Sequence, residues 1–176
     1  AREIIDDLGD RISAEKAAEK KDKGAGAPPE IRPSRTEIIC LPARDEADEL
    51  VGMMLSQTLR QAGYGATYLA IGTVNDMLEQ VAKGAYHIAC VSALPPFAVG
   101  QARSLCKRLR ERFPELLIVI GLWDFAGGVL KAQERVGTNC SDAVAASLSE
   151  GLLQIRRLSA GAVSYTHLTL PTILRV

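Results

Sequence analysis

The sequence predicts a doubly wound α/β domain on a parallel sheet of five strands. Short apolar runs of strand length alternate with longer stretches in which apolar residues recur at helical spacing. The short runs are apolar at consecutive positions, which is typical of parallel strands that helices cover on both faces. Strands are predicted at 37–41, 66–70, 87–91, 117–120 and 143–146, and helices at 45–62, 74–83, 97–113, 128–135 and 148–158.

Local signals support the first and last helices. The helix at 45–62 follows a cluster of carboxylates, and its buried side is predicted to consist of Leu50, Met53, Met54 and Leu59. The strand at 143–146 is the weakest of the five, but the capping-box pattern Ser147-Leu-Ser-Glu150 directly after it starts the last helix. Five strands in this alternation favour a flavodoxin-like sheet, whose ligand crevice lies at the carboxyl ends of the strands.

The composition excludes several classes of protein. The chain of 176 residues has 21 Lys plus Arg against 21 Asp plus Glu, so it lacks the basic charge of a nucleic-acid binder. With 47% hydrophobic residues it can bury a core without disulfides. The longest apolar run, 116–123, is too short to span a membrane. The spacing of the four cysteines indicates a reducing cytoplasmic setting, with Cys140 the most exposed of them.

The two ends are predicted to lie outside the folded domain at 36–158. Residues 1–20 have the spacing of an amphipathic helix, and 21–35, rich in Gly and Pro, form a flexible linker. Residues 159–176 are a tail. Within it, 163–172 resemble the translation of a sequencing-library adapter, so the chain is expected to be non-native from 163. A native C-terminal strand is the alternative.

Three loops at the carboxyl ends of the strands form the predicted crevice: 43–48, 92–97 and 123–128. The carboxylates of the first loop cap a helix and disfavour a phosphate, although a divalent cation on Asp45, Glu46 and Asp48 is an alternative. Trp123 is expected to stack on a flat or cationic ligand, and such loop residues to carry little core burial. The candidate ligand-binding residues are Arg44, Asp45, Glu46, Asp48, Ser92, Leu94, Pro95, Phe97, Gly121, Trp123 and Asp124.

No catalytic residue and no metal site is predicted. Ser92 lacks the flanking glycines of a nucleophile elbow, and His87 is expected at the opposite end of its strand, too far away to act as its base. A phosphoacceptor receiver domain is disfavoured, because the third strand ends Val91-Ser-Ala-Leu94 where the acceptor aspartate would stand.

Four phrases carry a resemblance to a known family. They are Cys40-Leu-Pro-Ala-Arg-Asp-Glu-Ala-Asp-Glu-Leu50, Val91-Ser-Ala-Leu-Pro-Pro-Phe97, Leu105-Cys-Lys-Arg-Leu-Arg110 and Arg112-Phe-Pro-Glu115. The span from 35 to 158 resembles the cobalamin-binding-like domain, and more closely its variant in the cytoplasmic C-terminal extension of autoinducer-2 exporter-type permeases.

The resemblance implies that cobalamin is not held by an axial histidine here. Cobalamin binders have a D-x-H-x-x-G motif after the first strand, and Asp48 stands at its His position. The S-x-L motif is kept as Ser92-Ala-Leu94. The glycine pair after the fourth strand becomes Gly121-Leu122, which would obstruct the nucleotide tail of the cofactor. No cofactor is therefore expected.

The function implied by the resemblance is a non-catalytic regulatory or ligand-sensing module of a membrane permease. Its expected partners are the membrane-embedded part of the same polypeptide and a small non-phosphate ligand, at the cytoplasmic face of the inner membrane, with this fragment itself soluble. Two alternatives stay open. One is a cobalamin-type cofactor domain without histidine ligation, and the other is a small α/β enzyme that uses the carboxylates from Asp45 to Asp48.

Overall fold

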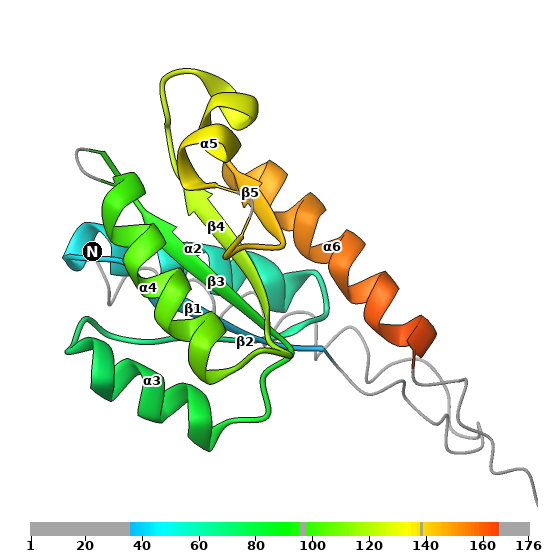
Figure 1. Cartoon of the computed structure of the whole chain (residues 1–176). Coiled ribbons are helices and arrows are strands. Elements are labelled where there is room, and N and C mark those ends of the chain that lie inside the picture. Colours follow the sequence, from blue (N-terminus) through cyan, green and yellow to red (C-terminus); the bar gives the residue numbers. More distant parts are fainter. Residues whose placement is uncertain (1–35, 96–97, 138, 166–176) are drawn as a thin grey trace, which may run out of the picture.

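The computed structural model describes residues 36–95, 98–137 and 139–165 (Figure 1). The elements follow one another as β1 (Glu37–Pro42), α2 (Glu46–Gln61), β2 (Gly65–Tyr68), α3 (Val74–Lys83), β3 (Ile88–Ala93), α4 (Ala98–Arg112), β4 (Leu117–Leu122), α5 (Gly128–Val136), β5 (Ala143–Ala145) and α6 (Leu148–Tyr165). The helix expected at 1–20, the linker at 21–35 and the tail from 166 onward lie outside the described residues.

All five strands are parallel, in the order β2-β1-β3-β4-β5. This order reverses direction between β1 and β3, because the chain first adds β2 on one side of β1 and then builds β3, β4 and β5 on the other. The predicted doubly wound, flavodoxin-like sheet is therefore confirmed. Its switch point, where such sheets bind ligands, lies between the carboxyl ends of β1 and β3.

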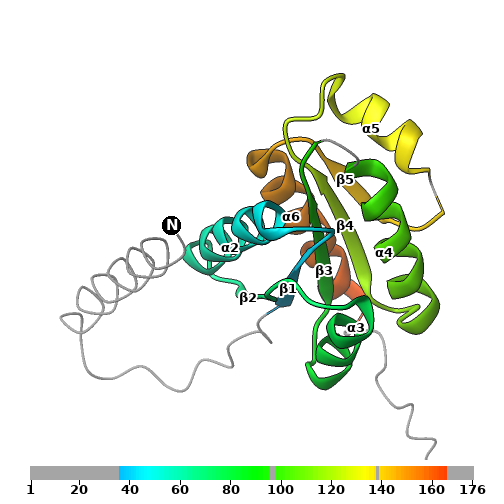
Figure 2. The ribbon, with the colours of Figure 1, turned by 90° about the vertical axis from the view of Figure 1, so that its left-hand side faces the viewer.

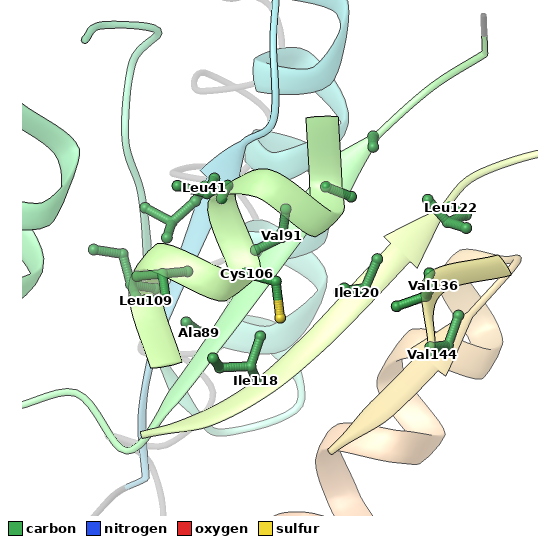
Figure 3. Packing of buried hydrophobic residues seen from close by; sticks show 14 of the residues in the cluster. Leu41, Ala89, Val91, Cys106, Leu109, Ile118, Ile120, Leu122, Val136 and Val144 are labelled. Atoms are coloured by element: carbon green, nitrogen blue, oxygen red, sulfur yellow. The ribbon is translucent and has the colours of Figure 1, made fainter. Parts of the chain in front are cut away.

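Helices cover both faces of the sheet. In Figures 1 and 2, α2 and α6 lie on one side, and α3, α4 and α5 on the other. Successive strand residues point to opposite faces. Ile38 and Cys40 accordingly join the core under α2 and α6, while Ile39 and Leu41 join the core under α3, α4 and α5. Figure 3 shows the second core, with Leu109 of α4 packed over residues of β3 and β4.

Side-chain caps begin the helices where the sequence predicts them. Asp45 is the N-cap of α2, and its Oδ1 accepts hydrogen bonds from the backbone N–H groups of Ala47 and Asp48. The predicted capping box of α6 is confirmed: the Glu150 N–H donates to Ser147 Oγ at 3.2 Å. The Glu150 carboxylate in turn accepts from the N–H of Ala146, one residue before the expected partner, at 2.9 Å.

The helix predicted at 148–158 is too short. The structure continues α6 to Tyr165. Ser159 remains buried, and its hydroxyl donates to the carbonyl oxygen of Ile155 at 2.8 Å. Leu158 also still packs against the core under α2 and α6. The contact of α6 with the core therefore extends beyond residue 158, where the predicted helix ends.

Candidate functional site

The loops after β1 and β3 are joined to each other at the switch point. Asp48 Oδ1 accepts a hydrogen bond from the backbone N–H of Leu94 at 2.7 Å. The N–H of Ala43 donates to the carbonyl oxygen of Ser92 at 2.9 Å. Asp48 is only 2% exposed. The crevice that the topology predicts at this point is therefore bridged by the chain itself.

Burial and backbone hydrogen bonds act on the pKa of the Asp48 carboxyl in opposite directions. Burial raises the pKa of Asp48 above its usual value, and the nearby Asp45 carboxylate raises it further. The N–H of Leu94 lowers the pKa, as do the N–H groups of Asp45 and Arg44. The contact with the N-cap residue Asp45 resembles the reciprocal bond of a capping box. Asp48 thus serves both the start of α2 and the loop after β3.

The other carboxylates of this loop do not converge on a common point. Asp45 caps α2, whereas Glu49 is buried and its Oε2 accepts from the N–H of Ile71 at 2.8 Å, in the β2–α3 loop. Glu46 is exposed. Within the described ranges, no group of three His, Cys, Asp or Glu side chains is placed to hold a metal ion. Asp45, Asp48 and Glu49 are neighbours in the sequence, but each carboxylate accepts hydrogen bonds from a different part of the backbone.

Trp123 fills the space above Gly121. Its indole Nε1 donates to Ser92 Oγ at 2.5 Å, and the side chain is 4% exposed within the core under α2 and α6. A Cβ atom added at Gly121 would overlap the indole ring, and one added at Gly151 of α6 would lie 3.2 Å from Trp123 Cη2. The ring is therefore enclosed between β4 and α6.

This placement corrects two expectations. Trp123 is not free to stack on a ligand, because its ring belongs to the core. Asp48, Ser92 and Trp123 were expected to carry little burial, yet they are 2%, 0% and 4% exposed. The pattern of polar residues after strands located them at the correct edge of the sheet. It could not show that these side chains turn inward and bond to each other's loops.

The remaining candidate residues form an exposed rim around this edge. We define the rim as Arg44, Asp45, Glu46, Pro95 and Asp124, all of which are exposed. Leu94 is half-buried, Gly121 is covered by the indole, and Phe97 lies outside the described residues. Asp124 has a φ of 57°, and its N–H donates to the carbonyl oxygen of Ala146, which ties the end of β4 to the residue after β5.

Two of the hollows in the described part of the chain are relevant here, and both lie away from the predicted crevice. One, of about 550 Å³, is at the opposite edge of the sheet and includes His87, Arg112 and Phe113. His87 is at the strand end predicted for it, and its Nδ1 accepts from the N–H of Glu37 at 3.1 Å. The other hollow, of about 540 Å³, lies between α4 and the chain after α5. Residues 112–115, one of the four phrases that carry the family resemblance, line the first hollow. Each hollow is formed by two segments that are distant along the chain.

Comparison with solved structures identifies the type of fold. The chain is similar to a cobalamin-binding protein from Desulfitobacterium hafniense, with 16% identity and a TM-score of 0.57 over 71% of this chain and 60% of that one. It is also similar to the monomethylamine corrinoid protein of Methanosarcina barkeri, with 18% identity and a TM-score of 0.55 over 70% of this chain and 57% of that one. The fold is cobalamin-binding-like.

These similarities concern the fold alone, since the identities are low. The chain spans about 60% of the length of the D. hafniense protein. Response regulators also match, among them an orphan response regulator of H. pylori with 15% identity and a TM-score of 0.46 over 70% of this chain and 98% of that one. No family model matches the chain. No curated protein matches it either.

Proposed function

We propose that this chain is a non-catalytic regulatory module of a membrane permease, which uses a cobalamin-binding-like fold without holding cobalamin. The observation that carries the proposal is the position of Trp123. Its indole fills the space above Gly121 and bonds to Ser92, so the interior of the sheet edge is occupied by the protein's own side chain. What is left for recognition is the exposed rim.

The environment of Asp48 argues against cobalt ligation. Asp48 stands where the resemblance places the axial histidine, and the chain's one histidine in the described residues, His87, lies at the opposite edge of the sheet. The Asp48 carboxylate is buried and engaged by the N–H of Leu94. To reach a metal in the crevice it would have to release that donor and leave it unpaired, at a cost of about 1–3 kcal/mol.

The permease context comes from the resemblance of the four sequence phrases. None of the helices that the structure describes is long and apolar enough to span a membrane. A membrane part would then have to be supplied by chain outside the described ranges. In this proposal the module is tethered to the membrane-embedded part of the same polypeptide.

The charge of the rim suggests what it contacts. Asp45, Glu46 and Asp124 give it three carboxylates against the single guanidinium of Arg44. An acidic surface disfavours phosphate and other anions. Cytoplasmic loops of membrane proteins carry an excess of Lys and Arg. We therefore assign the rim to a basic cytoplasmic segment of the permease. The alternative occupant, which the experiment below distinguishes, is a small non-phosphate ligand.

Titration with hydroxocobalamin tests the absence of cofactor binding. The absorption spectrum of the mixture is expected to equal the sum of the two components at every ratio. A shifted spectrum would contradict the proposal. His87→Ala then shows whether an imidazole is responsible, since loss of the shift in that variant would identify the ligand.

Transport by the full-length protein tests the regulatory role. Glu46→Gln and Asp124→Asn reduce the negative charge of the rim, and both are expected to change the transport rate in reconstituted vesicles several-fold. Glu79→Gln, at an exposed carboxylate on α3, is the matched control and should leave the rate unchanged. Normal transport by both rim variants, and by a protein that lacks residues 36–165, would overturn the proposal. If a small molecule, and not a basic peptide, restores the transport rate of the rim variants, the rim binds a small ligand instead of a segment of the permease.

A further inference from the structure

Two cysteines far apart in the sequence meet beside the core under α3, α4 and α5. Cys106, on α4, is fully buried, and Figure 3 shows its sulfur directed toward the sheet near Ile118 and Ile120. Cys140 precedes β5, is half-buried and packs against the same cluster. The two side chains are near enough for Cys140 to raise the pKa of the Cys106 thiol, in addition to the larger effect of burial. Both are free in this structure.

Arg110 holds Cys140 against α4. Its Nη2 and Nε donate to the carbonyl oxygen of Cys140 at 3.3 and 3.4 Å, one helical turn beyond Cys106. Nη2 also donates to Asp142 Oδ2 at 2.6 Å, and that oxygen accepts from the N–H of Ile118 at 2.7 Å. The backbone on both sides of Ser141 is thus fixed to α4 and β4. These hydrogen bonds therefore hold Cys140 beside α4, the helix that carries Cys106.

The hollow of about 540 Å³ leads to Cys140 from solvent. Its lining includes Arg103, Ser104 and Lys107 of α4 together with Cys140. The two cationic side chains are exposed at its edge. A partly exposed thiol beside positive charge is the environment in which protein cysteines react with oxidants. Cys106 has no such access, so a reaction that joins the two thiols must begin at Cys140.

The same chain contains a second pair of neighbouring cysteines as a natural control. Cys40 and Cys90 are register partners on β1 and β3, and both are 0% exposed. Burial raises the pKa of Cys90 to about 12 and raises the pKa of Cys40 as well. Like the Cys106 and Cys140 pair, they lie on neighbouring elements of the fold. They differ from it in having no half-buried member that an oxidant can reach.

We propose that Cys106 and Cys140 form a reversible intramolecular disulfide when the protein meets a peroxide. The Cys140 sulfur attacks one peroxide oxygen, so that an S–O bond forms, the O–O bond breaks, and the first water leaves. The Cys106 sulfur then attacks the Cys140 sulfur. An S–S bond forms and the S–O bond breaks, and the hydroxyl leaves as a second water with the Cys106 proton. The two thiols lose two electrons and one peroxide gains them.

Burial governs the second step. It raises the pKa of the Cys106 thiol well above the usual value, and the hydrogen bond to Cys140 raises it further. Because Cys106 is fully buried, species in solvent do not reach its thiol, and its reaction depends on a partner that the packing holds beside it. In a reducing compartment the dithiol is the resting form. The disulfide would tie α4 to the segment before β5, independently of any function of the rim.

The test is treatment of the reduced protein with one equivalent of hydrogen peroxide, followed by alkylation in denaturant. Two of the four thiols are expected to resist alkylation, with a mass loss of two hydrogen atoms. After trypsin without reductant, the peptide 104–107 should be linked to the peptide 136–156. Dithiothreitol should release both. The thermal midpoint of the oxidised protein should lie above that of the reduced form, because a cross-link restricts the unfolded chain.

Variants separate the pair from other oxidation products. Cys140→Ser should keep three alkylatable thiols after peroxide and show no rise in thermal midpoint. Cys90→Ala, which removes a cysteine from the other pair, should still give the linked peptides in full yield. A link between Cys40 and Cys90 would overturn the proposal. So would oxidation of Cys140 to a sulfinic acid while Cys106 remains fully alkylatable.

Discussion

The indole N–H of Trp123 and the hydroxyl of Ser92 form a buried hydrogen bond of 2.5 Å between the ends of β4 and β3. The two strands are direct neighbours in the sheet. The ring of Trp123 therefore lies over Gly121 at the end of β4. Its one polar atom, the indole nitrogen, finds its hydrogen-bond partner on the neighbouring strand β3. This bond joins the parts of the sheet edge that other proteins of this topology use for ligands.

Removal of Trp123 should strongly destabilise the domain. Trp123→Ala is expected to lower the free energy of unfolding by about 3–5 kcal/mol, since it leaves a cavity in the core under α2 and α6. Ser92→Ala keeps the ring but leaves its N–H unpaired, at a cost of about 1–3 kcal/mol. Urea denaturation of the single and double variants measures both effects. If the two losses simply add, the hydrogen bond is not the link that the structure indicates.

Gly121 should not tolerate a side chain. Gly121→Ala would place a methyl group inside the Trp123 ring, and because the ring is enclosed we expect a loss of about 1–3 kcal/mol in unfolding free energy. Gly100→Ala on α4 is the control, because no atom lies within 4 Å of its added Cβ. That change should be neutral or stabilising by up to about 1 kcal/mol. Equal effects of the two substitutions would argue against the placement of the indole.

The pH dependence of stability should report Asp48. Its folded pKa is raised by burial, so the folded state binds the proton more tightly than the unfolded state does. The stability contributed by this group therefore increases as the pH falls from neutral through the folded pKa, and levels off below the unfolded value near ~3.9. Asp48→Asn removes this dependence. Between pH 7 and pH 4, the unfolding free energy of the wild-type protein should rise relative to that of Asp48→Asn.

Loss of Arg110 should weaken the fold and the cysteine pair together. Arg110 donates to the carbonyl oxygens of Pro114 and Leu116 at 2.9 and 3.1 Å, besides its bonds to Cys140 and Asp142. Because its side chain is 28% exposed, the ion pair itself contributes at most about 1 kcal/mol. Including the lost carbonyl bonds, Arg110→Ala should lower stability by about 1–3 kcal/mol. The yield of linked peptides after peroxide should also fall, whereas Arg103→Ala should leave stability within about 0.5 kcal/mol.

Truncations should locate the end of the native domain. Deletion of 163–176 is expected to change the unfolding free energy by less than ~1 kcal/mol. Deletion of 159–176 removes the buried Ser159 and the last turns of α6, and should destabilise the protein measurably. Thermal unfolding of the two shortened chains distinguishes these cases. A large loss in the first deletion would mean that the adapter-like segment packs natively.

Much of the fold could be predicted from local patterns. The unbroken apolar runs at β1, β3 and β4 predict buried parallel strands, because only a sheet covered on both faces hides side chains that point both ways. The carboxylate of Asp45 and the motif from Ser147 to Glu150 mark the starts of helices. Their side chains accept hydrogen bonds from backbone N–H groups of the first turn, which have no partner within the helix. Such signals act within a few residues and are visible in the sequence itself.

Local sequence patterns are enough to predict the strands, the edge of the sheet at which a site would lie and the residues present there. How those residues are used depends on contacts between segments that are distant along the chain. Asp48 turns to Leu94, the indole of Trp123 bonds to Ser92, and Cys140 packs beside Cys106. Each partner is far away along the chain or on another strand. The direction of a side chain depends on the space and the donors that packing leaves around it, and no local pattern of residues encodes that space.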